Sequence, residues 1–250
     1  MATYVIGDIH GCFDEFMEML RIIDCDDEDE IICVGDYIDR GPKSFEMLKW
    51  MENQPENVLL IKGNHDVEYT ANIDIMKNFN ERLELSMDDN IDTRTLYLAM
   101  QRIPAVKEAY FDYYMSLREL IFEKNVSLKQ LILWANMINN MPYTYKKTIN
   151  GRKCVMVHAG YRPNDLDFYI YAREEAYTEA FVEHGMIIAG HTPTVIETKF
   201  AFNGGKIYRK YNEKYDCIYY DIDCGCAYRS KYPEGRLACI RLEDEEMFYV

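Results

Sequence analysis

The chain is short of positive charge and has no long apolar run. Its 250 residues include 28 lysines and arginines against 43 aspartates and glutamates, a formal net charge of −15. Binding to a nucleic-acid backbone or an anionic membrane needs clusters of basic side chains, so this balance argues against both, although a small positive pocket around one phosphate is compatible with it. No apolar run approaches bilayer-spanning length, and because residues 1–6 run straight into the first motif we expect no signal peptide. We expect a cytoplasmic protein with no nucleic-acid or membrane partner.

The sequence also lacks paired cysteines. None of its eight cysteines stands in a Cys-x-x-Cys pair, and Cys33, Cys154 and Cys239 lie in apolar, strand-like runs. This pattern favours reduced, buried thiols over a disulfide framework or a zinc site. Internal repeats, low-complexity segments and linkers rich in Pro, Gly and Ser are absent as well. We therefore expect a single domain over residues 1–250.

Charge gathers in one short stretch, Gly35-Asp36-Tyr37-Ile38-Asp39-Arg40-Gly41, which directly follows the apolar run 31–34. A short apolar run of this kind predicts a buried strand. Two carboxylates and a guanidinium would then lie where a strand leaves its sheet, and open α/β sheets bind their ligands at that place. Taken alone, the stretch could equally be a solvated acidic turn, so the other motifs decide between these interpretations.

Two further predicted strands, residues 2–6 and 57–61, also end in polar clusters. These clusters are Gly7-Asp8-Ile9-His10-Gly11 and Lys62-Gly63-Asn64-His65-Asp66. Helical patterns separate the three strands, and such strand–helix–strand crossovers are right-handed and place neighbouring strands parallel. The three clusters should therefore meet at one edge of one sheet, which brings together Asp8, His10, Asp36, Asn64 and His65.

The middle of the chain, residues 67–140, contains no motif that indicates chemistry. Apolar residues show helical spacing over 96–122 and again over 128–138. A stripe of Tyr and Met at this spacing is more often core than a cofactor site. We expect a helical insertion beside the site.

Strand patterns return after this region. Predicted strands 153–157 and 186–189 end in His158-Ala159-Gly160 and Gly190-His191-Thr192, and a predicted helix over 170–183 contains Arg173. From residue 195 onward, alternating apolar residues predict a second, largely antiparallel sheet. Its expected strands are residues 195–202, 206–211, 217–222, 236–242 and 246–250.

Four of the five histidines lie in short glycine-containing clusters at the ends of predicted strands, and only His184 does not. A lone histidine is more often a core residue than a ligand, and we keep that interpretation for His184 alone. Asp, His and Asn side chains in one cleft suit Mn²⁺, Fe or Zn²⁺ better than Ca²⁺ or a thiolate-bound metal. The candidate ligands are too many for one tetrahedral ion and fit two ions that share a carboxylate.

Together, the strand-end motifs resemble those of the phosphoprotein phosphatase family of calcineurin-like metallophosphoesterases. They are most similar to those of bacterial serine/threonine phosphatases and symmetrical diadenosine tetraphosphate hydrolases, and they cover residues 1–66 and about 150–225. The segment Asp223-Cys224-Gly225 resembles the late Asp-x-Gly segment of the family. The resemblance implies an α/β fold with two central mixed β-sheets packed face to face and flanked by helices.

The resemblance also implies the metal ligands. One ion would be held by Asp8, His10 and Asp36, and a second by Asp36, Asn64, His158 and His191, with Asp36 as the bridge. Two divalent ions are expected, with Mn²⁺ preferred and Fe or Zn²⁺ as alternatives.

The catalytic residues follow from the same resemblance. His65 would protonate the leaving oxygen, and Asp39 would orient His65 and raise its pKa. Arg40 and Arg173 would bind phosphoryl oxygens. Lys62 stands where protein phosphatases of the family usually have Arg, and since lysine lacks the two-pronged guanidinium, we expect a weaker grip on phosphate there.

These residues predict a phosphoester hydrolase in which a metal-bridging hydroxide attacks phosphorus in line. Our main hypothesis is a serine/threonine protein phosphatase acting on phosphorylated protein, because the diadenosine hydrolases often lack an acid at the position of Asp39. The alternative is a symmetrical diadenosine tetraphosphate hydrolase acting on a small phosphoester. Outside enzymes, a catalytically silent phosphate-binding module is disfavoured by the intact set of ligands. The sequence leaves the oligomeric state open.

Overall fold

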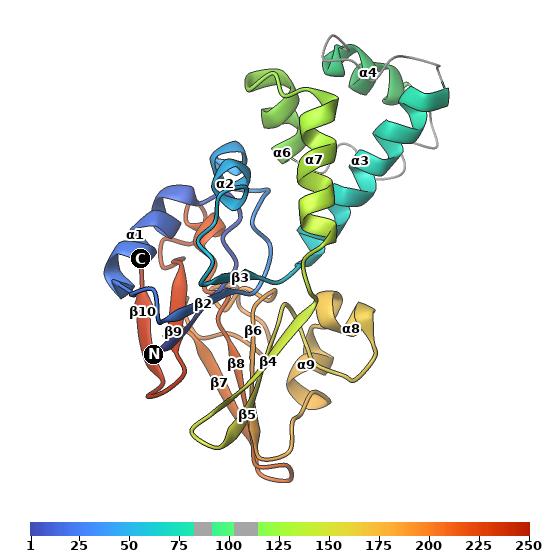
Figure 1. The fold of residues 1–250 in the computed structure, drawn as a ribbon. Helices are drawn as coiled ribbons and strands as arrows, with labels where there is room; N and C mark the ends of the chain where they lie inside the picture. The colour runs from blue at the N-terminus through green and yellow to red at the C-terminus, as the bar shows by residue number, and fades with distance from the viewer. Residues whose placement is uncertain (83–91, 103–114) are drawn as a thin grey trace.

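The computed structural model describes residues 1–82, 92–102 and 115–250. They form two five-stranded sheets packed face to face, with helices on the outer faces and a helical arm that projects from one end (Figure 1). This is the two-sheet α/β architecture that the family resemblance implied. Within the described residues, no helix combines the length and the apolar character that crossing a bilayer requires.

The first sheet has the strand order β10-β9-β1-β2-β3. Its parallel strands are β1 (Thr3–Ile6), β2 (Glu30–Cys33) and β3 (Val58–Leu60), and its antiparallel strands are β9 (Ala238–Arg241) and β10 (Glu246–Tyr249). The register pairs Ile6 with Cys33 and Cys33 with Leu60, so β1, β2 and β3 end level with one another. Their following loops therefore meet at one edge, as the sequence predicted.

The second sheet has the order β4-β5-β6-β8-β7. Its central strands β5 (Arg152–Val157), β6 (Gly185–Ala189) and β8 (Cys217–Asp221) are parallel, and β4 (Thr144–Ile149) and β7 (Tyr208–Asn212) flank them in antiparallel orientation. Both sheets are thus mixed. His158 begins the loop after β5, and His191 is the second residue of the loop after β6. Both lie in motifs that the sequence analysis identified as parts of the site.

Successive side chains of a strand point to opposite faces of its sheet, so each sheet packs against the other sheet on one face and against helices on the other. In β1, Ile6 faces the outer helices and Val5 faces the opposite sheet; in β6, Ile188 faces the first sheet and Ile187 faces the helices on its own side. All four are fully buried. Burying each such side chain contributes about 1.5–3 kcal/mol, so the two-sided burial of both sheets holds the strand ends in place.

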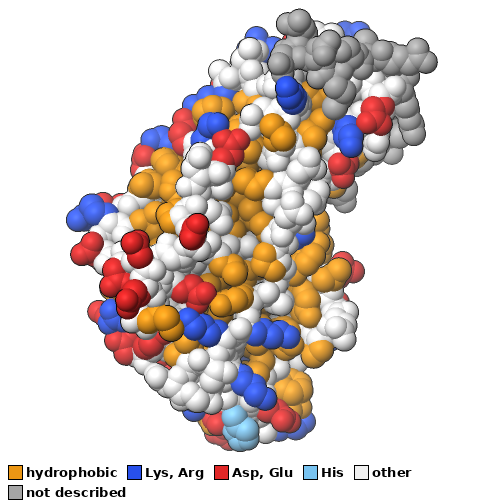
Figure 2. Space-filling view, viewed as in Figure 1, with side chains coloured by type: hydrophobic (Ala, Val, Ile, Leu, Met, Phe, Trp, Pro, Cys, Tyr) orange, Lys and Arg blue, Asp and Glu red, His pale blue; other side chains and the backbone are white. Residues whose placement is uncertain are grey.

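Short helices cover the outer faces of the sheets. Those on the first sheet are α1 (Phe13–Ile23) and α2 (Ser44–Met51), and those on the second are α8 (Leu166–Tyr171) and α9 (Glu174–Thr178) (Figure 1). A short 3₁₀ turn, η2 (Cys226–Tyr228), follows β8. The face shown in Figure 2 has a band of apolar side chains between the arm and the sheets, while acidic groups gather over the side of α1 and β10.

The predicted helical insertion forms the arm. Its elements are α3 (Asn64–Arg82), α4 (Thr93–Met100), α6 (Met115–Arg118), the π-helical turn η1 (Glu119–Glu123) and α7 (Leu128–Asn139). Helices α3 and α7 lie side by side, and the Tyr69 hydroxyl donates to the Leu131 carbonyl at 3.2 Å. The predicted helix over 128–138 is confirmed as α7. The helical pattern predicted over 96–122 corresponds to the end of α4, which stops at Met100, and to α6 and η1. Residues 101 and 102 form a turn, and residues 103–114 lie outside the described part.

The C-terminal part departs from the sequence-based expectation. Strands after residue 195 do not form a separate sheet, because β7 and β8 join β4–β6 while β9 and β10 join β1–β3. Residues 195–202 form turns rather than a strand, and the Ala201 amide donates to the Thr198 hydroxyl at 3.1 Å. Local side-chain bonds of this kind compete with strand pairing, and periodicity alone does not reveal them.

The predicted helix over 170–183 is also wrong. The chain forms α8 and α9 instead, separated by Ala172 in an extended conformation (φ −61°, ψ 134°) and by Arg173 at the start of α9. The break places Arg173 at a bend rather than on a helix face.

Candidate metal centre

The six predicted metal ligands lie together at the carboxyl ends of the strands. They follow five strands drawn from both sheets, and each is at most 8% exposed. The residues are Asp8, His10, Asp36, Asn64, His158 and His191. The level strand ends therefore deliver carboxylate, imidazole and amide groups from distant parts of the chain to one buried place.

Asp36 lies at the middle of this cluster. Its Oδ2 atom is 3.4 Å from His10 Nε2 and 3.5 Å from His158 Nε2, while its Oδ1 atom accepts the His65 amide at 2.9 Å. Two groups of candidate ligand residues share Asp36, and within each group the ligand atoms lie within 4.8 Å of one another. The first group contains His10 and His65, and the second contains His158 and His191. A shared carboxylate between two sets of donors suits a site for two ions.

Backbone carbonyls orient two of the histidines. The Nδ1 atom of His10 lies 2.9 Å from the Ile38 carbonyl, and that of His158 lies 2.9 Å from the Val34 carbonyl. An N–H donated in this way leaves Nε2 as the metal-binding atom and fixes the ring. His191 Nε2 is buried and has no hydrogen-bond partner among the described residues. The donor atoms present thus fit divalent ions.

The local backbone is unusual at the same residues. His10, Asp36, Asp39, Arg40 and His191 all have positive φ angles, between 48° and 72°. Non-glycine residues occupy this left-handed region rarely, and such residues concentrate at functional sites. The sharp turns allow side chains from successive strands to converge.

Two glycines make room for the carboxylates. A Cβ atom at Gly63 would clash with Asp36 Oδ1, and one at Gly190 would clash with Asp8 Oδ1. The Asp8 carboxylate also accepts the His191 amide, at 3.2 Å from each oxygen. The glycines of these motifs are therefore needed for close approach of backbone to carboxylate.

The electrostatics of the cluster suit a cation. Burial lowers the pKa values of His10, His158 and His191, so their rings are neutral and have a free lone pair. Burial alone would raise the pKa of Asp36, but nearby positive charge, including that of the His65 imidazolium and the Arg40 guanidinium, holds this pKa well below its usual value. Burial and the nearby carboxylates raise the pKa of Asp8. Positive ions in the cluster would offset the repulsion between these carboxylates.

His65 and Asp39 form a hydrogen-bonded pair beside the cluster. His65 Nδ1 lies 2.8 Å from Asp39 Oδ2. Burial would lower the pKa of His65, but the Asp36 and Asp39 carboxylates outweigh burial and raise it. The imidazolium form is therefore favoured, which is the form that donates a proton.

The predicted phosphate-binding cations occupy different places. Arg40 Nη2 lies 2.8 Å from His65 Nε2 and Arg40 Nη1 lies next to His10 Nε2, so the guanidinium lies at the cluster. Arg173 Nη1 lies 3.5 Å from the Thr192 hydroxyl, next to His191. Lys62 instead donates to the Asn139 carbonyl at 3.2 Å, and its ammonium lies 4.2 Å from the centre of the Tyr143 ring. Its ammonium is thus directed at the base of the arm rather than at the cluster.

Three residues that support the site had no assigned role in the sequence. Asp66 accepts the amides of Asp36 and Gly63, each at 2.8 Å, and burial raises its pKa to about 8. Asp223 is buried, and its Oδ2 atom has no hydrogen-bond partner among the described residues; burial raises its pKa to about 6. Ser116, from the arm, donates to Asp39 through its amide at 3.2 Å and through its hydroxyl. Asp66 and Asp223 stand in or near motifs, whereas no sequence signal marks Ser116.

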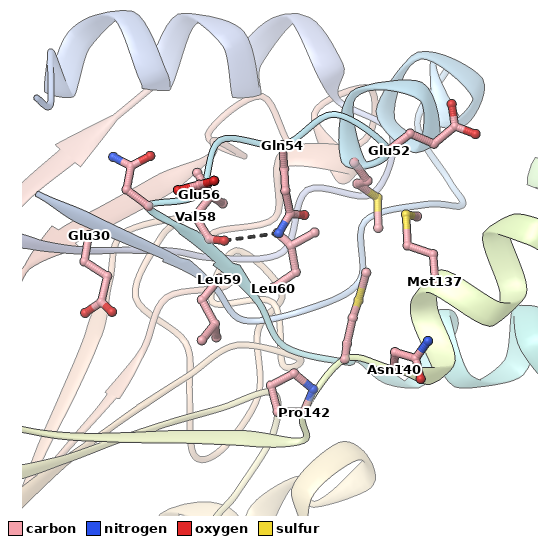
Figure 3. A pocket seen from close by; sticks show the side chains of 13 residues that line it. Glu30, Glu52, Gln54, Glu56, Val58, Leu59, Leu60, Met137, Asn140 and Pro142 are labelled. Carbon is pink, nitrogen blue, oxygen red and sulfur yellow. Dashed lines mark hydrogen bonds between the residues drawn. The ribbon is translucent and has the colours of Figure 1, made fainter. Parts of the chain in front are cut away.

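A separate hollow of about 490 Å³ lies against the outer edge of β3, between the ends of α2 and α7 (Figure 3). The charged residues that line it are Glu30, Glu52 and Glu56. Three carboxylates without a lining lysine or arginine disfavour an anionic ligand. Phosphate chemistry is therefore better placed at the strand-end cluster.

Comparison with known proteins agrees with this geometry. The Calcineurin-like phosphoesterase family matches residues 1–224 of the chain. A symmetrical bis(5'-nucleosyl)-tetraphosphatase of Buchnera aphidicola subsp. Baizongia pistaciae is 44% identical over 79 residues, which are 31% of this chain and 28% of that protein. The match thus spans less than a third of the relative's length.

Solved structures share the fold. A metallophosphoesterase from Sphaerobacter thermophilus aligns with a TM-score of 0.54 at 15% identity, covering 100% of this chain and 86% of that one. A protein serine/threonine phosphatase from Saccharomyces cerevisiae aligns with a TM-score of 0.50 at 14% identity, covering 100% and 79%. These likenesses show the architecture alone. The family match, over nearly nine-tenths of the sequence, establishes that the chain belongs to the calcineurin-like phosphoesterase family.

Proposed function

We propose that this protein is a two-metal phosphoester hydrolase whose substrate is a dinucleoside polyphosphate, cleaved symmetrically. The observation that supports hydrolysis is the buried cluster around Asp36, with the His65–Asp39 pair beside it. The substrate is inferred from the curated relatives, which are named symmetrical bis(5'-nucleosyl)-tetraphosphatases. These names favour the alternative of our sequence analysis over its main hypothesis, a serine/threonine phosphatase.

Metal binding would involve residues of both sheets. Asp8, His10 and Asp36 would hold one divalent ion, and Asp36, Asn64, His158 and His191 a second. When bound, such ions neutralise phosphoryl oxygens and lower the pKa of a bound water toward neutrality. The expected Mn²⁺, with Fe or Zn²⁺ as alternatives, and the cytoplasmic location stay predictions.

The protein's own side chains would bind the phosphoryl oxygens and protonate the leaving oxygen. Arg40 and Arg173 would bind the phosphoryl oxygens through their guanidinium groups. His65, protonated and held by Asp39, would give its proton to the leaving oxygen. Burial of His65 and Asp39 excludes water from the proton donor and strengthens its interaction with the charge that develops on the leaving group.

The second candidate, phosphoserine or phosphothreonine hydrolysis, is supported by Asp39 itself. A serine alkoxide leaves poorly unless it is protonated, so an aspartate that keeps His65 protonated is of most use with such substrates. The position of Asp39 within hydrogen-bond distance of His65 therefore keeps this candidate open to direct test.

One assay separates these functions. The protein with added Mn²⁺ is given diadenosine tetraphosphate, a phosphoserine peptide and 4-nitrophenyl phosphate side by side, and the nucleotide products are separated. We expect ADP as the only nucleotide product and the highest kcat/KM for the dinucleotide. A higher kcat/KM for the peptide would favour the protein phosphatase, and ATP with AMP would contradict symmetrical cleavage. Metal binding without turnover of any phosphoester would indicate a silent phosphate-binding module.

A further inference from the structure

The Asp39 carboxylate has partners on both of its oxygens. Oδ2 faces His65, and Oδ1 accepts the amide of Ser116 at 3.2 Å and the Ser116 hydroxyl. Ser116 lies 77 residues further along the chain, in helix α6 of the arm. Both residues are almost fully buried, at 2% and 1% exposure. A buried carboxylate needs donors, and here the arm supplies two of them.

The same arm segment also holds the loop that contains Asp39. Glu119, one turn after Ser116, accepts the amides of Ser44 and Phe45 at 3.1 and 3.2 Å. Helix α2 begins at Ser44, and its N-cap residue makes no side-chain capping bond. Glu119 thus performs that capping from another part of the chain.

Ser44 connects the two anchors. The Asp39 amide donates to the Ser44 hydroxyl at 3.3 Å, so the loop is held at Asp39 and at the start of α2 by residues three apart on the arm. Asp39 itself has a φ of 68°, a conformation that an aspartate adopts only where its surroundings determine it. The contacts from Ser116 and Glu119 are part of those surroundings.

We propose that Ser116 is a positioning residue for the Asp39–His65 pair, so that the arm completes the catalytic site. By holding Oδ1, the serine directs Oδ2 at His65 and so fixes the imidazole that gives its proton to the leaving oxygen. The inference rests on the proposed hydrolase function. It predicts that Ser116 matters in proportion to how much the leaving group needs a proton.

The test compares Ser116→Ala with Ser127→Ala in the full chain with Mn²⁺. Ser127 is a matched control, because it is also an arm serine whose hydroxyl makes one hydrogen bond, to the Gln130 amide at 3.2 Å. The substrates are 4-nitrophenyl phosphate, with a good leaving group, and phenyl phosphate, with a more basic one. For Ser116→Ala we expect kcat on phenyl phosphate to fall about tenfold, a smaller fall on 4-nitrophenyl phosphate and little change in KM. Ser127→Ala should show no dependence on the leaving group.

Two further variants separate positioning from packing. Added to Asp39→Asn, Ser116→Ala should cause no further loss of kcat, because the group that it positions is already altered. If Ser116→Ala unfolds, Ser116→Cys keeps the volume and replaces the hydroxyl by a weak donor, and it should show the same dependence on the leaving group.

The outcomes are distinguishable. If the unaltered protein hydrolyses neither aryl phosphate nor the dinucleotide, the proposed function fails and this inference fails with it. If it hydrolyses them but Ser116→Ala and Ser127→Ala lower kcat equally for both leaving groups, the function stands and the role of Ser116 is overturned.

Discussion

The strand-end cluster and the helical arm contribute to one site in different ways. In the cluster, each candidate ligand follows a strand within a few residues and stands within two residues of a glycine, so short motifs mark it. In the arm, Ser116 and Glu119 lie in helical segments, and only their contacts with Asp39 and the start of α2 reveal them. The residues that would react are thus marked by local sequence, whereas residues that hold them in place are determined by tertiary packing.

The largest expected effect lies in the cluster, at Asp36. Because this carboxylate belongs to both groups of ligand atoms, Asp36→Asn should lower kcat/KM about a thousandfold or more and reduce the metal bound per chain. Metal content after gel filtration and kcat/KM on 4-nitrophenyl phosphate measure the two effects. Asp216→Asn, at a partly exposed ion pair with His184, is the control. Unchanged metal content in Asp36→Asn would contradict the shared-ligand arrangement.

Replacing His65 should have the next largest effect. His65→Asn removes the proton donor, so kcat on phenyl phosphate should fall about 10²–10⁴-fold, with a smaller fall on 4-nitrophenyl phosphate. Metal content should stay that of the unaltered protein, and retention of full kcat on phenyl phosphate would exclude His65 as the acid.

The pH dependence of kcat tests the pair itself. The Asp36 and Asp39 carboxylates raise the pKa of His65, so the protonated, active form should be lost only as pH rises through this raised value. Asp39→Asn removes one carboxylate and should lower that pKa, which moves the fall in kcat to lower pH. Profiles on phenyl phosphate with constant Mn²⁺ measure the shift. A fall that moves to higher pH, or does not move, would contradict the assignment.

On the arm, Glu119→Gln should act mainly on stability. Glutamine offers one carbonyl oxygen where the carboxylate offers two, so one of the amides of Ser44 and Phe45 loses its partner. A lost helix cap costs about 1 kcal/mol, which urea unfolding can resolve. Thermal or urea midpoints equal to those of the unaltered protein would show that the arm does not hold α2.

The smallest effect is expected at Lys62. Its ammonium contacts the Asn139 carbonyl and the Tyr143 ring, so Lys62→Met should lower stability by about 1 kcal/mol and leave KM for phosphoesters nearly unchanged. A several-fold rise in KM with unchanged stability would instead support the phosphate-binding role that the family resemblance assigned to it.

The sequence predicted the architecture well where apolar strand patterns alternated with helical patterns. Apolar strands ending in Gly-Asp or Gly-Asn placed Asp8, Asp36 and Asn64 at one edge, because parallel strands joined by right-handed crossovers end together. His158 follows a strand of the other sheet, and only the family resemblance assigned it to the same site. The prediction failed where partners are distant in sequence. Strand β9 pairs with β1 across more than 230 residues, and no local pattern shows which sheet such a strand joins.

The arm limited prediction for a related reason. Helical spacing identified α7, but it could not show that Lys62 turns toward Asn139 or that Ser116 reaches Asp39, since a helix pattern reports which face is buried and not what covers it. The sequence analysis did not predict the start of helix α3, because its first residues, Asn64 and His65, belong to a motif that indicates chemistry rather than structure.

The first turn of α3 links two site residues to the orientation of the arm. Helix α3 has 19 residues and is therefore a rod of roughly 28 Å, with Asn64 and His65 in its first turn. Asp8, Asp36 and His158 are attached to sheets, whereas these two residues turn with the rod. The position of His65 therefore depends on the tilt of α3, and the Tyr69–Leu131 hydrogen bond connects this helix to α7. A change in the tilt of α3 would therefore displace His65 relative to Asp8 and Asp36.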